Sequence, residues 1–129
     1  MRARQVSVFA ENRPGRLRAL LAVLAQASIN IRALSIADSA DFGIVRMILA
    51  DAEAGQRTLR EAGFTVMVSD VLEVQVPDRP GGFLEGVVTP LTEAGVNIEY
   101  VYAFADNPLE HALVVLKVND LAKAEKLIG

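Results

Sequence analysis

Two short loops carry the residue types of this chain that could bind a charged small molecule. Arg13-Pro14-Gly15 is repeated later as Arg79-Pro80-Gly81. Each copy follows an apolar run and precedes a helical pattern, so each loop presents free backbone N–H groups at a helix start, which attract a carboxylate. An arginine strengthens such a site, and a glycine lets a ligand approach the backbone. Pro-Gly also makes ordinary turns, and the sequence alone does not choose between the two roles.

A second repeated feature lies about one helix further along. Ile29-Asn30-Ile31 follows the first loop, and Val96-Asn97-Ile98 follows the second. An asparagine amide can bond both the amino and the carboxyl group of one ligand. Asparagine also suits turns, because it tolerates left-handed backbone. The sequence is compatible with either role.

Other chemistry is sparsely represented. The chain has no cysteine and a single histidine, His111, which argues against a metal site. Several carboxylates fall at predicted turns or helix caps, and we find no phosphate-loop, dinucleotide or nucleophile motif. We therefore predict no enzymatic activity, no cofactor and no metal. The turn and cap carboxylates are Asp38, Asp41, Asp51 and Asp106.

Composition narrows the partners and the location. The net charge is −3 and the basic residues are scattered, which disfavours nucleic acid. No stretch approaches the roughly 18 apolar residues that a membrane span needs, and the N-terminus lacks the apolar core of a signal peptide. We expect a cytoplasmic protein that binds neither nucleic acid nor membrane.

The first half of the chain reads as one unit with the order β-α-β-β-α-β. Leu17, Leu20, Leu21 and Leu24 mark one apolar helix face. Asp51 is expected to cap the second helix, with Leu59 and Ala62 facing inward, and Gly63 to end it. This order predicts an α+β, ferredoxin-like unit, an antiparallel sheet with both helices on one face. Its strands are predicted at 5–10, 29–37, 44–49 and 65–69, with a turn at 38–41.

The second half repeats this order but stops early. Pro90 lies inside its first helix and predicts a kink or an early end. Asn119 or Asp120 caps the last helix, and no eighth strand follows. The first strand of this copy then has an open neighbour position, which a second chain could fill; a shorter tail is the other interpretation. The copies span 1–70 and 71–129, the second with strands at 71–76, 96–104 and 112–118 and a turn at 106–108.

These paired motifs resemble the ACT domain. The matching segments are 11–17 with 28–31, and 78–83 with 94–98. The chain is similar to small stand-alone tandem ACT proteins, and its first copy also resembles the regulatory subunit of acetolactate synthase. Ser28 departs from the pattern, because a glycine is expected there and Gly95 keeps it.

The resemblance implies a non-catalytic regulatory protein that binds a small ligand, most often an amino acid, at an interface between ACT units. Such units often pair side by side through their second strands, so the two repeats are expected to form one extended sheet. A homodimer is expected as well. The alternative is a regulatory subunit docking on a biosynthetic enzyme such as acetolactate synthase. Carried over residue by residue, the resemblance implies a ligand site at Asn12, Arg13, Gly15, Arg16, Leu17, Asn30, Ile31, Asp78, Arg79, Gly81, Gly82, Phe83, Asn97 and Ile98.

Overall fold

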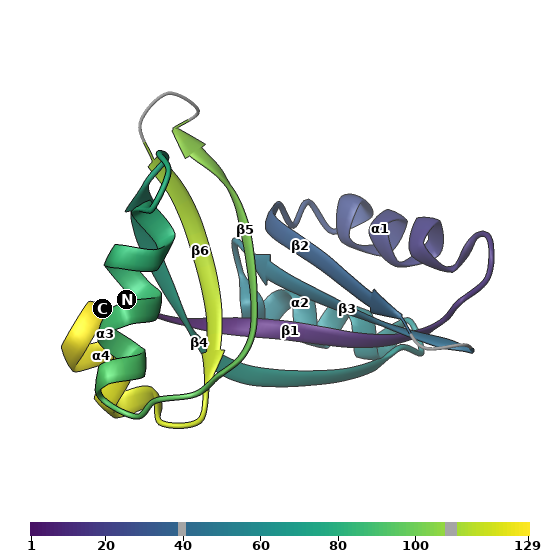
Figure 1. Cartoon of the computed structure of the whole chain (residues 1–129). Coiled ribbons are helices and arrows are strands. Elements are labelled where there is room, and N and C mark those ends of the chain that lie inside the picture. Colours follow the sequence, from purple (N-terminus) through teal and green to yellow (C-terminus); the bar gives the residue numbers. More distant parts are fainter. Residues whose placement is uncertain (39–40, 108–110) are drawn as a thin grey trace. The chain divides into compact units, whose positions relative to one another are not determined.

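A computed structural model describes residues 1–38, 41–107 and 111–129 (Figure 1). The turns predicted at 38–41 and 106–108 include Ser39, Ala40 and Pro108, which lie outside the described residues. The chain divides into two compact units. One comprises Arg4–Ser69, and the other comprises Asp70–Gly129 together with Met1–Ala3. No helix in the described part of the chain is long and apolar enough to cross a membrane.

The first unit has the predicted β-α-β-β-α-β order. Its strands follow the hydrogen-bonding order β2-β3-β1-β4, in which β3 pairs antiparallel with both β1 and β2. This is the strand order of a ferredoxin-like unit, so the predicted fold class is confirmed. The elements are β1 (Arg2–Glu11), α1 (Arg16–Gln26), β2 (Ile31–Asp38), β3 (Phe42–Leu49), α2 (Ala52–Glu61) and the first part of β4 (Thr65–Pro77).

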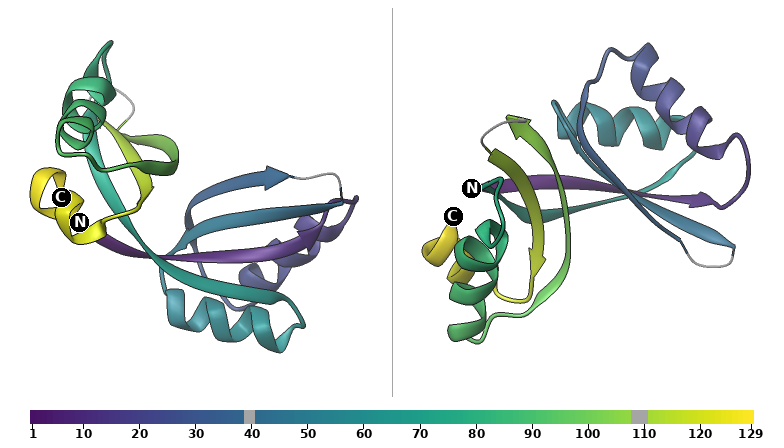
Figure 2. Two further views of the ribbon diagram at one scale, coloured as in Figure 1. Left: turned by 60° about the horizontal axis from the view of Figure 1, so that its bottom comes forward. Right: turned by 45° about the horizontal axis from the view of Figure 1, so that its top comes forward.

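One apolar core lies between this sheet and its helices (Figure 2). Leu20 and Leu24 of α1 and Leu59 of α2 are fully buried, as their helical spacing predicts. Ala62 is exposed at the C-cap of α2, so its predicted inward position is wrong. Asp51 caps α2 as predicted, because its carboxylate accepts a hydrogen bond from the Ala54 N–H at 3.0 Å.

The second unit repeats the arrangement. β6 pairs antiparallel with β4 on one side and with β5 on the other. Val74, Val87 and Leu116 belong to its core, and α4 contributes Ala124. Asp120 caps α4 by accepting from the Lys123 N–H at 3.1 Å. The elements are the rest of β4, η1 (Leu84–Val88), α3 (Thr89–Glu93), β5 (Ile98–Asn107), β6 (His111–Val118) and α4 (Leu121–Ile128).

The strands predicted at 65–69 and 71–76 are one continuous strand, β4. Asp70 belongs to this strand and does not break it. In hydrogen-bonding order β2 and β5 are the end strands.

The chain's own first residues occupy the neighbour position that the sequence leaves open in the second unit. The Glu73 N–H donates to the Met1 carbonyl at 2.7 Å, and the Met1 amino group donates to the Glu73 carbonyl at 2.9 Å. Arg2 adds an exposed ion pair with Glu125 of α4, at 3.2 Å. β1 thus begins in the second unit and continues into the first, which the sequence pattern did not predict.

Pro90 changes the first helix of the second unit without ending it. The segment before it, η1, is a π-helix, in which the Thr89 N–H donates to the Leu84 carbonyl five residues back. Proline has no N–H and clashes with the carbonyl four residues back. The wider π turn accommodates that clash, and such turns are found mostly as single insertions in α-helices. The predicted distortion is present, and α3 continues the helix to Glu93.

Candidate functional site

The two Arg-Pro-Gly loops share a backbone turn that requires glycine. Gly15 has φ 91° and Gly81 has φ 82°, both in the left-handed region that side chains avoid. The Ala19 N–H donates to the Gly15 carbonyl, and the Glu85 N–H to the Gly81 carbonyl, both at 2.9 Å. The turn alone therefore explains why both copies contain the glycine.

Both loop arginines pair with a carboxylate that lies close to them in the sequence, at the end of β1 or in η1. Arg13 Nε lies 2.6 Å from Glu11 Oε2, and Arg79 Nη2 lies 2.9 Å from Glu85 Oε2. Arg79 also donates to the Pro80 carbonyl at 3.2 Å. The hydrogen bond from Arg13 and its positive charge lower the pKa of the Glu11 carboxyl. A ligand carboxylate would have to compete with these partners.

Arg16 packs inside the first unit. Its guanidinium carbon lies 4.9 Å from the centre of the Phe64 ring, within the range of a cation–π contact. Among the described residues its Nε is buried without a hydrogen-bond partner. The neighbouring Leu17 packs against the core of this unit. Packing within the first unit therefore explains the positions of the Arg16 and Leu17 side chains.

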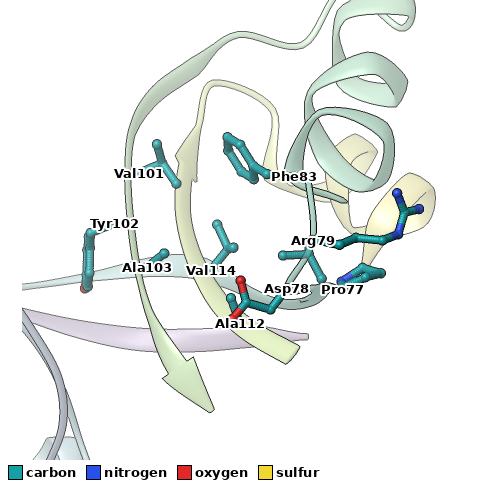
Figure 3. Close-up of a pocket in the computed structure, with 10 residues that line it drawn as sticks. Pro77, Asp78, Arg79, Phe83, Val101, Tyr102, Ala103, Ala112 and Val114 are labelled. Atoms are coloured by element: carbon teal, nitrogen blue, oxygen red, sulfur yellow. The ribbon is translucent and has the colours of Figure 1, made fainter. Parts of the chain in front are cut away.

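One cavity that predicted site residues line lies in the second unit (Figure 3). Its volume is about 370 Å³, within the range typical of small-molecule sites. The loop after β4 forms one wall, with Asp78, Arg79 and Phe83. The facing wall comes from β5 and β6 and is apolar. The remaining lining residues are Val76, Pro77, Val101, Tyr102, Ala103, Ala112 and Val114.

The register of the strands explains why this space exists. Val101 is opposite Leu116, and Ala103 is opposite Val114, so both face the side that carries the helix. The helix packs over β4 and β6 through Val87, while Val101 on the end strand keeps 41% of its surface exposed. Ala103 has a small side chain and lines the same cavity as Phe83.

Two further predicted residues shape the loop or its surroundings. A Cβ on Gly82 would collide with the Pro77 carbonyl oxygen, so glycine permits a close backbone approach there. The backbone N–H of Asn12 donates to the Asp41 carbonyl at 2.9 Å.

The repeated asparagines lie beyond the C-terminal end of the first helix of each copy, away from the loops that precede it. The Asn30 carbonyl accepts from the Ala50 N–H at 2.9 Å. The Asn97 carbonyl accepts from the Asn119 N–H at 3.2 Å, and its own N–H donates to the Asn119 side chain at 2.9 Å. Ile31 and Ile98 pack against the two cores. The asparagine backbones thus tie the start of the second strand to the end of the third.

A separate open hollow of about 390 Å³ lies beside Asn30 and Ile31, lined also by Leu21, Leu24 and Ser28. Its location shows that the structure does not bring Asn30 together with Arg13 in one site. The strand residues that line the cavity of the second unit were not predicted from the sequence. Aligning the two copies of the sequence at Asn30 and Asn97 pairs Ile36 with Ala103. The small residue at this position of the second copy would have identified Ala103.

Comparison with known proteins decides the family. The family model described as "ACT domain pair" matches residues 1–128. This chain belongs to the ACT domain pair family. The match confirms the resemblance drawn from the loops, and the chain therefore carries regulatory-type domains. No curated protein matches the chain.

Solved structures agree with this assignment. The chain is similar to protein BT0572 from Bacteroides thetaiotaomicron, with 38% identity, a TM-score of 0.92, and coverage of 98% of this chain and 86% of that one. It shares its fold with the ligand-free regulatory subunit of aspartate kinase from Thermus thermophilus, at 13% identity, a TM-score of 0.72 and 97% and 87% coverage. The corresponding Thermus flavus subunit shows 15% identity, a TM-score of 0.69 and the same coverage.

Proposed function

We propose that this ACT domain pair is a non-catalytic regulatory protein that binds a small ligand, an amino acid, in the cavity of its second repeat. The observation that carries the proposal is the coincidence of that cavity with the repeated loop. Asp78, Arg79 and Phe83 were selected through the family resemblance, and the same three residues line the cavity. Its volume of about 370 Å³ suits a ligand of amino-acid size.

The cavity lies beside a strand edge that could join a second chain. β5 pairs with β6 along one edge and is the last strand in the hydrogen-bonding order of the described residues. An open edge invites pairing, and a partner strand there would cover the exposed Val101. A ligand that binds only the assembled homodimer would stabilise it by about 2.7 kcal/mol at a hundredfold excess over Kd. Such a shift is large enough to regulate assembly.

Thermal-shift measurements with each of the twenty amino acids test the binding claim. We expect at least one of them to raise the melting temperature at millimolar concentration. If none does so, the proposed function is wrong. Sedimentation velocity with and without the active amino acid then tests whether the ligand favours the dimer.

A pair of alanine substitutions locates the site. Ala103→Ile adds bulk inside the cavity, and Ala37→Ile makes the same change on β2 of the first repeat, where the alanine is also exposed on an end strand. Overpacking costs about 1–3 kcal/mol, so Ala103→Ile should weaken binding roughly tenfold or more. Ala37→Ile should leave affinity unchanged. Equal effects of the two variants would place the ligand elsewhere.

A further inference from the structure

The charged groups at the cavity of the second repeat are not equivalent. In Figure 3 the carboxylate of Asp78 points toward β5 and β6, while the guanidinium of Arg79 points the other way. Arg79 is held there by Glu85, at 2.9 Å, and by the Pro80 carbonyl. The charge offered to a ligand in this cavity is therefore negative.

Asp78 is also available to a ligand. In the part of the chain that the structure describes, its carboxylate has no hydrogen bond or ion pair. An ionised carboxylate accepts strong hydrogen bonds from an ammonium group. The walls around it are formed mainly by aliphatic side chains, including Val76, Val101 and Val114. An exposed carboxylate on one wall and aliphatic side chains on the others match an ammonium group attached to an aliphatic chain.

The first repeat differs at the corresponding positions. The strand registers align Val8, Val45 and Ile36 with Val74, Val114 and Ala103. Ile36 thus stands where Ala103 lines the cavity, and its side chain is much larger. The cross-strand pair Leu34–Met47 of the first repeat likewise corresponds to the pair Val101–Leu116 of the second repeat.

The loops differ in charge as well. The repeated Arg-Pro-Gly motif aligns Asn12 with Asp78. An amide replaces the carboxylate, so the first repeat offers a larger strand residue and no negative charge at these two positions.

We propose that the second repeat recognises its ligand through the amino group, and that the ligands are small aliphatic compounds with a primary ammonium. Asp78 accepts the hydrogen bonds of the ammonium, and the aliphatic chain lies against Val101, Ala103 and Val114. The first repeat, with Asn12 and Ile36, does not share this preference. This inference rests on the proposed function, because it concerns the same cavity.

Three compounds separate the amino group from the carboxyl group. L-leucine carries both, 3-methylbutylamine is leucine without its carboxyl group, and 4-methylpentanoate is leucine without its amino group. Isothermal titration of the full chain should show binding of leucine and of the amine, with the acid at least about tenfold weaker, equivalent to about 1.4 kcal/mol.

Two matched variants assign the effect to one residue. Asp78→Asn gives the second loop the amide of the first, and should weaken leucine and the amine about tenfold or more while leaving the acid little changed. Asp70→Asn makes the same change at an exposed carboxylate of β4 that does not line the cavity, and it should leave all three affinities unchanged. Asp78 is exposed, so Asp78→Asn should fold, and circular dichroism checks that it does.

The outcomes separate this inference from the proposed function. Binding of the acid as tight as that of the amine, or an Asp78→Asn variant with unchanged affinity for leucine, would overturn the inference while leaving an amino-acid site in place. Binding of only polar or acidic amino acids would overturn the aliphatic class. If no amino acid binds the wild-type chain, the proposed function itself fails.

Discussion

Ser28 offers a sharp test of how the backbone of each repeat is stabilised. It follows α1 with φ 58°, in the left-handed region, and is the only non-glycine residue of the described chain with positive φ. The Ser28 N–H donates to the Ala25 carbonyl and the Ile29 N–H to the Leu24 carbonyl, both at 3.0 Å. This is the Schellman pattern, which favours glycine at the position that Ser28 occupies.

The second repeat performs the same turn with glycine. Gly95 has φ 75°, and its N–H donates to the Thr92 carbonyl while the Val96 N–H donates to the Leu91 carbonyl. A left-handed residue other than glycine costs about 1–2 kcal/mol. Glycine lowers the free energy of unfolding by about 0.4–1 kcal/mol, because it gives the unfolded chain more conformational freedom. Ser28→Gly should therefore stabilise the protein by about 0.5–1 kcal/mol.

The reverse substitution should cost a similar amount. A Cβ built on Gly95 meets no described atom within 4 Å, so Gly95→Ser adds backbone strain without a steric clash. The two turns lie in different units, and effects at independent sites add. The double variant should therefore unfold close to the wild type.

Urea unfolding followed by circular dichroism measures these changes, and hydrogen exchange assigns them to the correct repeat. A change of 1 kcal/mol corresponds to a melting shift of roughly 2–6 °C in a chain of this size. Ser28→Ala is the control, because it keeps the Cβ and removes the hydroxyl; its stability should match that of the wild type. A neutral or destabilising Ser28→Gly, beside a destabilising Ser28→Ala, would refute the reasoning and show that the hydroxyl stabilises the turn.

Three further results are expected from the loops. Arg13→Ala should raise the pKa of Glu11 toward its ordinary value, because it removes the hydrogen bond and the charge that lower this pKa. The stability that the lowered pKa contributes is present above the pKa of the unfolded state and is lost as the pH falls through the folded-state pKa. An NMR titration of the glutamate side chains detects the shift. Gly82→Ala should destabilise the second repeat by about 1–3 kcal/mol, because its Cβ would collide with the Pro77 carbonyl; unchanged urea unfolding would contradict this. Arg79→Gln should reduce leucine affinity less than Asp78→Asn in the same titration, because Arg79 points away from the cavity; a larger loss would restore the arginine to the binding site.

Local chemistry made much of the fold predictable. The leucine spacing of α1 predicted its buried face, because helical periodicity depends on residues close together in the chain. Asp51 predicted one helix start, and the pair Asn119 and Asp120 predicted another, because capping is local as well. The duplicated loop predicted the two repeats for the same reason.

Features that join distant segments were not predictable in this way. The pairing of Met1 with Glu73 depends on where β1 enters the second unit. The continuity of β4 through Asp70 depends on the strands on either side of it.

The candidate site likewise has features that depend on residues close together in the chain and features that depend on distant ones. The sequence by itself determined the turns at Gly15 and Gly81, since a left-handed backbone position selects glycine whatever surrounds it. Only the tertiary structure decided which loop residues face a cavity. It placed Ala103 opposite Val114 and in the same cavity as Asp78, and it turned Arg79 toward Glu85. The physical reason is that a cavity is shaped by strand register and by the competition of ion partners, and both depend on residues far apart in the chain.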